Sequence, residues 1–487
     1  MRRWRTVIGL EVHAQVLSAR KAFCFCPTTP SEANSNTCAI CLGEAGSLPV
    51  LNLDAVRVAL RAAAALRCSS ISETLEFDRK SYSYPDLPKG YQITQRRKGL
   101  GAGGCVEFEA EGVLRRVGLE GAHFEEDSAK TTYRGDAIDV DYNRCGRALV
   151  EIVTLPELES GSEAAACARE IQRVLRRAGA SEARFEEGSM RVDVNVSVRD
   201  DDHLRPKVEV KNLNSLRAVR AACDYEARRQ AEIYDAGGVV AQETRSWDGG
   251  ETVRSRAKGG AEVYRYAPEP DLPPRPLESL VGRSVADHVD ALRREIEPHI
   301  PAAVRARLRK RLDPLAAAGL VDADDYGRTA RVAFFDACVA HGAKPKPTAA
   351  WILGDVAGAL RKLEFDTIAD SNLSPVDLAE LLALLDQGTV SRRAAKDLLP
   401  DLLQRRTSSS VEDLVFERGL ARISDVAALR QFAREALDAH PNELAAYHAG
   451  KKNLEKLFIG KALAASGGRA DPVLMRDVVR DCLLQAS

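Results

Sequence analysis

Three segments in the first half of the chain alternate apolar and polar residues, which is the pattern of β-strands with one buried face. They are IGLEVHAQV at residues 8–16, MRVDVNVSV at residues 190–198 and VEVKN at residues 208–212. The last two are joined by the turn-rich RDDDHLRPK, so they predict a hairpin. If the apolar positions face a core, the opposite faces carry Glu11, His13, Asp193, Asn195, Glu209 and Lys211.

Helical patterns, in which apolar residues recur every three or four positions, become dominant after a proline-rich break. Prolines at 268, 270, 273, 274 and 276 favour extended backbone and the edge of a domain. Helices are predicted before this break at residues 52–68 and 161–179, and after it at residues 374–388, 424–440, 442–468 and 471–486.

The two patterns together predict an α+β chain of three domains. Residues 1–292 would form a mixed α/β domain, residues 293–405 an all-helical domain and residues 406–487 a helical tail domain. The chain shows no internal repeat and no low-complexity tract.

Composition narrows the class of protein. The 487 residues are 45% hydrophobic and 29% charged, as in globular proteins, and the formal net charge is −1. Contact with nucleic acid therefore cannot be inferred from overall basicity and would need local patches. The opening MRRWRTVIGLEVHAQV has too short an apolar run for a secretory signal, and no segment has the length of a membrane span. We expect a cytoplasmic protein without membrane contact.

Four of the eleven cysteines, Cys24, Cys26, Cys38 and Cys41, form a C-x-C pair and a C-x-x-C pair. Disulfides are not expected in a reducing cytoplasm. Two close pairs joined by a polar loop suit tetrahedral Zn²⁺, and the alternative is four small buried hydrophobic residues. The intervening PTTPSEANSNT cannot bury the thiols itself, which favours zinc. With four protein ligands the ion would be structural, because no position is left for substrate.

The polar faces of the predicted strands suit a hard cation, although solvent exposure is the simpler interpretation of any one strand. Two further segments add carboxylates: HFEEDSAK contains Glu125 and Glu126, and FEEGSM contains Glu187. So many carboxylates beside apolar strands would repel one another unless cations neutralise them. We therefore predict Mg²⁺ that holds nucleotide phosphates, with lysines balancing the phosphate charge.

The segment FDRKSYSYPDLPKGYQITQ, residues 77–95, is rich in lysine and tyrosine and too rich in proline for a helix. Lys80, Tyr82 and Lys89 predict contact with a ligand, against the alternative of a packed surface loop. The chain has neither a P-loop motif nor G-x-G-x-x-G, so ATP would have to bind without either of these phosphate cradles.

Nine motifs in one order resemble a known family. They are GLEVHAQ, CAICLGEAGSLPVLN, FDRKSYSYPDLPKGYQITQ, HFEEDSAK, VDYNRCGRALVEIV, FEEGSMRVDVNVSVR, EVKNLNS, QETRSWD and YRYAPEPDLPP. The chain resembles the B-type subunits of the aspartyl/glutamyl-tRNA amidotransferases over almost its entire length. SPVDLAELLALLDQGTVS and NELAAYHAGKKN resemble the helical and tail domains of that family. The chain departs from the family at Cys145 and Arg147.

The resemblance implies a fold and a reaction. The first domain would be a cradle-like catalytic domain, and the tail domain would bind tRNA. The protein would use ATP to phosphorylate the side-chain carboxylate of mischarged Glu-tRNA(Gln) or Asp-tRNA(Asn). Ammonia channelled from the A-type amidase subunit would then displace phosphate, and a small C-type subunit would brace the heterotrimer.

The resemblance also implies roles for individual residues. The catalytic residues would be Glu11, His13, Glu125, Glu126 and Asp193, of which Glu11, His13, Glu126 and Asp193 would bind Mg²⁺. The residues along the ATP, substrate or ammonia route would be Lys80, Tyr82, Lys89, Glu151, Glu187, Asn195, Glu209 and Lys211. Cys24, Cys26, Cys38 and Cys41 would hold a structural zinc ion.

Two alternatives belong to other classes of protein. A zinc-stabilised RNA-binding module without catalysis explains the cysteines and the helical tail, but it leaves the acidic faces unexplained because they would repel phosphate. An ATP-dependent ligase for a small acid leaves the long helical part without a purpose. ATP hydrolysis that requires aminoacyl-tRNA distinguishes the amidotransferase hypothesis from both alternatives.

Overall fold

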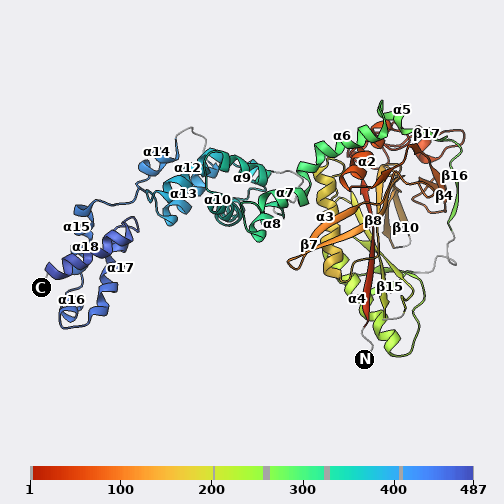
Figure 1. The fold of residues 1–487 in the computed structure, drawn as a ribbon. Helices are drawn as coiled ribbons and strands as arrows, with labels where there is room; N and C mark the ends of the chain where they lie inside the picture. The colour runs from red at the N-terminus through yellow and green to blue at the C-terminus, as the bar shows by residue number, and fades with distance from the viewer. Residues whose placement is uncertain are drawn as a thin grey trace. The chain divides into compact units, whose positions relative to one another are not determined.

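The computed structural model describes residues 4–135, 137–200, 203–255, 264–322, 330–404 and 410–485. The chain divides into two compact units, Met1–Ala306 and Arg307–Ser487. The first unit contains the strands and the second is helical, which confirms the mixed α/β part followed by a helical part (Figure 1).

A ten-stranded sheet forms the centre of the first unit, in the order β15-β14-β13-β12-β1-β11-β8-β6-β2, with β7 also paired to β8. The strands are β1 (Arg5–Gln15), β2 (Ser70–Ile71), β6 (Gly101–Ala102), β7 (Cys105–Ala110), β8 (Val113–Glu126), β11 (Ala148–Thr154), β12 (Met190–Arg199), β13 (Val208–Leu213), β14 (Thr244–Trp247) and β15 (Thr252–Arg254). The N-terminal strand β1 lies between β11 and β12 and is antiparallel to both.

Alternation along β1 and β12 determines which side chains enter the core, as predicted. Ile8, Leu10, Val12 and Ala14 of β1 are buried together with the valines of β12. The strands β12 and β13 pair antiparallel, which confirms the predicted hairpin. Successive side chains of a strand point to opposite faces, so the intervening polar residues gather on the other face of the sheet.

Three long helices pack with the apolar face of the sheet into one core: α2 (Leu53–Ala65), α3 (Gly161–Arg177) and α4 (Leu216–Asp235). Their N-termini are capped by side chains. Asn52 accepts from the backbone amides of Asp54 and Ala55, and Ser160 and Ser215 cap α3 and α4. Such caps satisfy amides that lack a partner within the helix. Figure 1 shows α3 and α4 running alongside the strands.

Shorter elements complete the first unit. Three small sheets are formed by β4 (Asp78–Ser81), β5 (Tyr91–Thr94) and β16 (Arg265–Pro268), by β9 (Lys130–Arg134) and β10 (Ala137–Asp141), and by β3 (Thr74–Leu75) and β17 (Arg275–Pro276). The helices are α1 (Ala39–Leu42), α5 (Leu277–Val281) and α6 (Val285–Ile296), followed by η1 (Glu297–His299) and by α7 (Pro301–Leu308), within which the boundary between the two units falls. The strand β5 lies against the end of β8, because Ile93 donates its amide to Glu126 and Phe124 donates its amide to Gln95.

The described residues of the second unit form helices, joined by turns and isolated bridges. The first group is α8 (Pro314–Asp322), α9 (Ala330–Ala340), α10 (Pro345–Trp351), the π-helical turn η2 (Ile352–Val356), α11 (Ala357–Lys362), η3 (Ile368–Asp370), α12 (Pro375–Asp386), α13 (Arg392–Gln404) and α14 (Val411–Glu417). The helix α12 begins as predicted, with Ser374 as the N-cap and Pro375 in the first turn.

The last helices are α15 (Val426–Asp438), α16 (Pro441–His448), η4 (Lys452–Leu454), α17 (Glu455–Ala465) and α18 (Pro472–Gln485). Leu429, Phe458 and Met475 are fully buried in their shared core. A single helix over residues 442–468 was predicted, and this is wrong. Gly450 adopts a φ of +110° after α16, a conformation open to glycine that ends the helix and starts a turn.

The predicted division after residue 292 falls inside α6, whose Ile296 belongs to the core of the first unit. The division into domains 1–292, 293–405 and 406–487 stays a prediction. Among the described helices, none is both long enough and apolar enough to cross a membrane.

Candidate active site and metal centres

A row of polar residues crosses four neighbouring strands on the face opposite the core. His13 on β1 lies opposite Glu151 on β11 and opposite Arg191 on β12, and Glu151 lies opposite His123 on β8. This register places residues together that are more than a hundred positions apart in the sequence. One row further along, Glu11 on β1 lies opposite Asp193 on β12.

The side chains of Glu11, His13, Glu125 and Glu151, here named the acidic cluster, converge on one point. The Nε2 atom of His13 lies 3.6 Å from Glu11, 3.5 Å from Glu125 and 3.7 Å from Glu151. The ligand atoms of Glu11, His13 and Glu151 all lie within 4.8 Å of one another. Three such donors at this spacing can share one ion.

Burial shapes the protonation of the acidic cluster. Burial, together with the charge of Glu151, raises the pKa of Glu11 to about 9 and that of Glu125 to about 8. Burial lowers the pKa of His13 to about 4, so its imidazole is neutral at pH 7. Burial also disfavours the charged form of Glu151, but a 3.0 Å hydrogen bond with His123 and nearby charges lower its pKa.

These protonation states fit a divalent cation. Protons on Glu11 and Glu125 reduce the repulsion among the carboxylates of the acidic cluster, and a bound cation would remove this repulsion. The neutral imidazole of His13 can coordinate a metal ion. One oxygen of Glu125 is buried and has no hydrogen-bond partner among the described residues, which leaves an acceptor for a ligand. The acidic cluster therefore suits Mg²⁺, with Glu151 and Glu125 beside the predicted Glu11 and His13.

Asp193, predicted as a fourth magnesium ligand, lies next to the acidic cluster and pairs with a lysine. The Lys211 ammonium lies 3.8 Å from Asp193 and 3.3 Å from Glu209. Burial raises the pKa of Asp193 to about 6, although Lys211 acts in the opposite direction. Asn195 follows on the same face of β12, opposite Gly9 and Glu209. The predicted Asp193, Asn195, Glu209 and Lys211 are thus neighbours.

Glu126 lies apart from the acidic cluster, because Glu125 and Glu126 are consecutive on β8 and point to opposite faces. Its carboxylate accepts hydrogen bonds from the ammonium of Lys89 and from the backbone amide of Ile93 at 2.9 Å. Both charged side chains are buried. The structure therefore brings Lys89 and Glu126 together, but it does not bring Glu126 to Glu11 and His13.

We expect Lys89→Met to lower the free energy of unfolding by about 3 kcal/mol, because it leaves the carboxylate of Glu126 buried without its cation. Urea-induced unfolding of the full chain measures the loss. The double variant Lys89→Met, Glu126→Gln removes both charges and should recover most of it. A single variant as stable as the parent would mean that the pair is hydrated in solution.

Of the remaining predicted residues, Lys80 and Tyr82 lie near the acidic cluster and Glu187 does not join it. Burial lowers the pKa of Lys80, but the charges of Glu125 and other acidic groups outweigh this, so the net pKa is raised. The Lys80 ammonium lies 4.6 Å from the ring centre of Tyr264, which packs edge-on against Tyr82. Glu187 is exposed and pairs with Arg184 at 2.6 Å.

The sulfur atoms of Cys24, Cys26, Cys38 and Cys41 lie within 4.8 Å of one another in the four-cysteine loop, residues 24–41. All eleven cysteines of the chain are free of disulfides. A hydrogen bond with Cys24 lowers the pKa of Cys41 to about 4, although burial acts against it. The ammonium of the buried Lys21 lies 3.5 Å from the Cys41 sulfur, which favours a thiolate there. The four residues therefore fit Zn²⁺.

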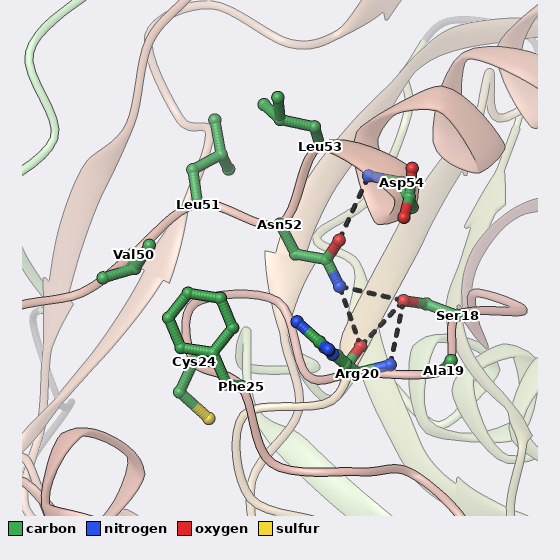
Figure 2. A pocket seen from close by; sticks show the side chains of 10 residues that line it. All are labelled: Ser18, Ala19, Arg20, Cys24, Phe25, Val50, Leu51, Asn52, Leu53 and Asp54. Carbon is green, nitrogen blue, oxygen red and sulfur yellow. Dashed lines mark hydrogen bonds between the residues drawn. The ribbon is translucent and has the colours of Figure 1, made fainter.

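A cavity of about 520 Å³ borders the four-cysteine loop, and no residue of the acidic cluster is among the residues that line it (Figure 2). Cys24 and Phe25 line it together with Asn52, which caps α2. The amide group of Asn52 donates to Ser18 and to the backbone carbonyls of Arg20 and Lys21. These polar groups are engaged in hydrogen bonds that hold the fold, so the cavity is a poor candidate for the catalytic site.

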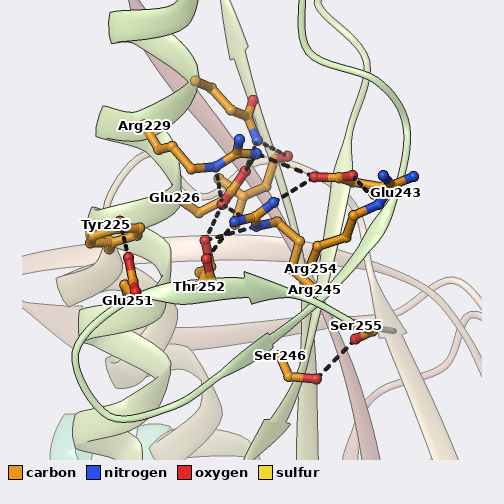
Figure 3. Close-up of polar contacts among 12 residues, drawn as sticks. Tyr225, Glu226, Arg229, Glu243, Arg245, Ser246, Glu251, Thr252, Arg254 and Ser255 are labelled. Carbon is orange, nitrogen blue, oxygen red and sulfur yellow. Dashed lines mark hydrogen bonds and ion pairs between the residues drawn. The ribbon is translucent and has the colours of Figure 1, made fainter. Parts of the chain in front are cut away.

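Sequence patterns did not predict an ion-pair network that joins α4 to β14 and β15. Figure 3 shows Glu226 of α4 at its centre; its carboxylate accepts from Arg229 at 2.6 Å and from Thr252 at 2.7 Å, and Arg245 lies 3.6 Å away. On β14, Thr244 donates to Glu209 at 2.9 Å. Thr244 is next to Arg245 on β14, so the network helps to hold the strand from which Thr244 contacts Glu209. Its signal in the sequence is a glutamate four residues after the buried Ala222 on the core face of α4.

Comparison with known proteins gives consistent matches. Residues 6–281 match a family model described as the GatB/GatE catalytic domain, and residues 333–483 match one described as the GatB domain. A glutamyl-tRNA(Gln) amidotransferase B-1 subunit of Micromonas pusilla is 41% identical over 98% of this chain and 88% of its own length. An aspartyl/glutamyl-tRNA(Asn/Gln) amidotransferase B-type subunit of Prochlorococcus marinus is 39% identical over 98% and 97%. One of Thermosynechococcus vestitus is 41% identical over 98% and 96%.

Proposed function

The chain belongs to the family of B-type subunits of aspartyl/glutamyl-tRNA amidotransferases, and from this we propose that it activates and amidates the side-chain carboxylate of a mischarged aminoacyl-tRNA. The substrate would be Glu-tRNA(Gln), Asp-tRNA(Asn) or both, and the energy would come from ATP. The A-type amidase subunit would supply ammonia and a small C-type subunit would complete the heterotrimer, in the cytoplasm.

A carboxylate is a poor electrophile, so the proposed reaction has two steps. An oxygen of the substrate carboxylate attacks the γ-phosphorus of ATP, the bond to the β-phosphate oxygen breaks, and ADP leaves an acyl phosphate behind. Ammonia then attacks the carbonyl carbon, and the carbon–oxygen bond to phosphate breaks. The amide forms, and the proton that ammonia loses leaves with the inorganic phosphate.

The observation that carries the proposal is the acidic cluster on the polar face of the sheet, with Lys80 and Lys211 near it. Lys211, held by Glu209 and Asp193, and Lys80 can offset phosphate charge and orient the substrate carboxylate. Mg²⁺ bound by the acidic cluster would offset the charge that develops on the transferred phosphoryl group. The four cysteines would hold zinc for the fold alone, because four ligands leave no position open.

The test is to purify the full chain together with its candidate amidase partner and to measure ATP hydrolysis with each mischarged tRNA. The proposal expects hydrolysis that depends on Glu-tRNA(Gln) or Asp-tRNA(Asn), with Gln-tRNA or Asn-tRNA as product when glutamine is present. An RNA-binding module would bind tRNA without hydrolysis. A ligase for small acids would turn over with free glutamate or aspartate.

The tail domain offers a separate prediction about tRNA binding. Lys456 and Lys461 lie on α17, and Lys452 lies in the turn before it, 4.0 Å from the ring centre of Tyr447. Solvation is the simpler explanation of such lysines. If they meet tRNA phosphates, replacing all three by Glu should weaken tRNA binding at least tenfold and reduce its dependence on salt. Unchanged affinity and an unchanged salt slope would support solvation.

A further inference from the structure

Lys21, three residues before the four-cysteine loop, is fully buried, with 0% of its surface exposed. Lysines are almost never fully buried without a partner of opposite charge. Its ammonium lies 3.5 Å from the sulfur of Cys41 and donates to the backbone carbonyl of Tyr142 at 3.1 Å. Among the ion pairs of the described residues, none joins Lys21 to a carboxylate.

A buried ammonium is stable only if a nearby group offsets its charge, and a neutral thiol offers a weak acceptor and no charge. A thiolate bound to zinc offers both. Four thiolates also outweigh the two positive charges of Zn²⁺, so a tetrathiolate centre in a buried place needs a cation of its own. The ammonium of Lys21 and the tetrathiolate zinc centre therefore offset each other's charge.

The second contact of Lys21 connects this pair to another part of the chain, the turn Tyr142–Gly146. Gly146 accepts a backbone hydrogen bond from Ala22 at 2.8 Å. The thiol of Cys145 donates to the carbonyl of Cys41 at 3.4 Å. This turn leads directly into β11, which carries Glu151 of the acidic cluster.

We propose that Lys21 is the cation that offsets the charge of the zinc centre and fastens the turn Tyr142–Gly146 to it. The proposal rests on the zinc site proposed above, and it makes Lys21 a positioning residue outside the coordination sphere. Loss of zinc reduces the negative charge that faces the Lys21 ammonium from a four-thiolate centre to the thiolate of Cys41, so the attachment of the turn weakens. Loss of the ammonium leaves the tetrathiolate with uncompensated charge.

The first test compares Lys21→Met with the parent full chain. Methionine keeps the unbranched apolar stem and most of the length of lysine but removes its charge. We expect the variant to lose zinc to a chromophoric chelator about tenfold faster than the parent, or more. Removal of residues that support metal ligands has effects of this size. Lys98→Met, which removes a partly exposed lysine paired with Glu76, is the matched control and should release zinc at the parental rate.

The second test needs no variant and therefore does not depend on the folding of Lys21→Met. Amide hydrogen exchange is measured on the parent chain before and after removal of zinc. Faster exchange over residues 142–146 after removal is expected, with little change in β12 and α4.

The outcomes separate the proposal from its premise. A parent chain purified without chelator that contains no zinc would overturn both. A parent that holds zinc, together with a Lys21→Met variant that releases it at the same rate, would overturn the role of Lys21 alone. Exchange over residues 142–146 that is unaffected by zinc would overturn the link to the turn.

Discussion

Asp193→Asn is expected to slow the formation of the phosphorylated aminoacyl-tRNA by about two orders of magnitude or more. The substitution keeps the size of the side chain and the geometry of β12 but removes a full negative charge. Asp193 lies opposite Glu11 and 3.8 Å from the Lys211 ammonium, so the charge balance beside the acidic cluster changes where phosphate would bind. The fold, the zinc content and tRNA binding should be unchanged.

Free ammonium tests where in the reaction Asp193 acts. The proposed defect precedes the attack of the amine, so added ammonium should not restore Gln-tRNA or Asn-tRNA formation in the variant. Rescue by ammonium would assign Asp193 to the ammonia route instead. Asp139→Asn, which removes a carboxylate exposed on β10 and paired with Arg134, is a control expected to react at the parental rate.

Cys38→Ser should abolish stoichiometric zinc and lower the free energy of unfolding by about 4 kcal/mol or more, because metal binding contributes directly to folding. The half-buried Cys38 lies 3.9 Å from the sulfur of Cys41, and a serine hydroxyl is a much poorer ligand than a thiolate. Elemental analysis gives the zinc content and urea titration gives the stability. The rate of the chemical step per folded molecule should change far less.

Cys105→Ser is the matched control, because Cys105 is also partly buried but lies outside the four-cysteine loop. It should keep its zinc and most of its stability. If Cys38→Ser were as stable as this control, the four cysteines would be ordinary packed residues, which is the alternative left open by their spacing.

The face that each strand presents could be predicted from the sequence, because alternation is a local property. The alternation correctly assigned Leu10 and Val12 to the buried face of β1 and Glu11 and His13 to the opposite face. The partners across the sheet could not be predicted in this way. That His13 meets Glu151 depends on strand pairing over a long stretch of chain, and no local pattern specifies it.

Two further differences between the predictions and the structure have local causes that can be recognised in the sequence. Glu125 and Glu126 were grouped as if they faced one ion, but consecutive residues of a strand face opposite ways. The break after α16 follows from Gly450, whose residue type permits a positive φ without requiring it. The ammonium of Lys21 is different, because a lone lysine before a cysteine pair gives no sign of its complete burial.

The position of β1 between β11 and β12 has a consequence for biosynthesis. This strand leaves the ribosome well before its neighbours and cannot complete its hydrogen bonding until residues 148–154 and 190–199 have also been made. At ordinary rates of translation, about 10 to 40 s pass between the synthesis of β1 and that of β12, and the apolar side chains of β1 lack these strand neighbours during that time. During that interval the nascent chain exposes a strand with two free edges, which makes it a substrate for molecular chaperones and sensitive to the speed of translation over the codons between β1 and β12.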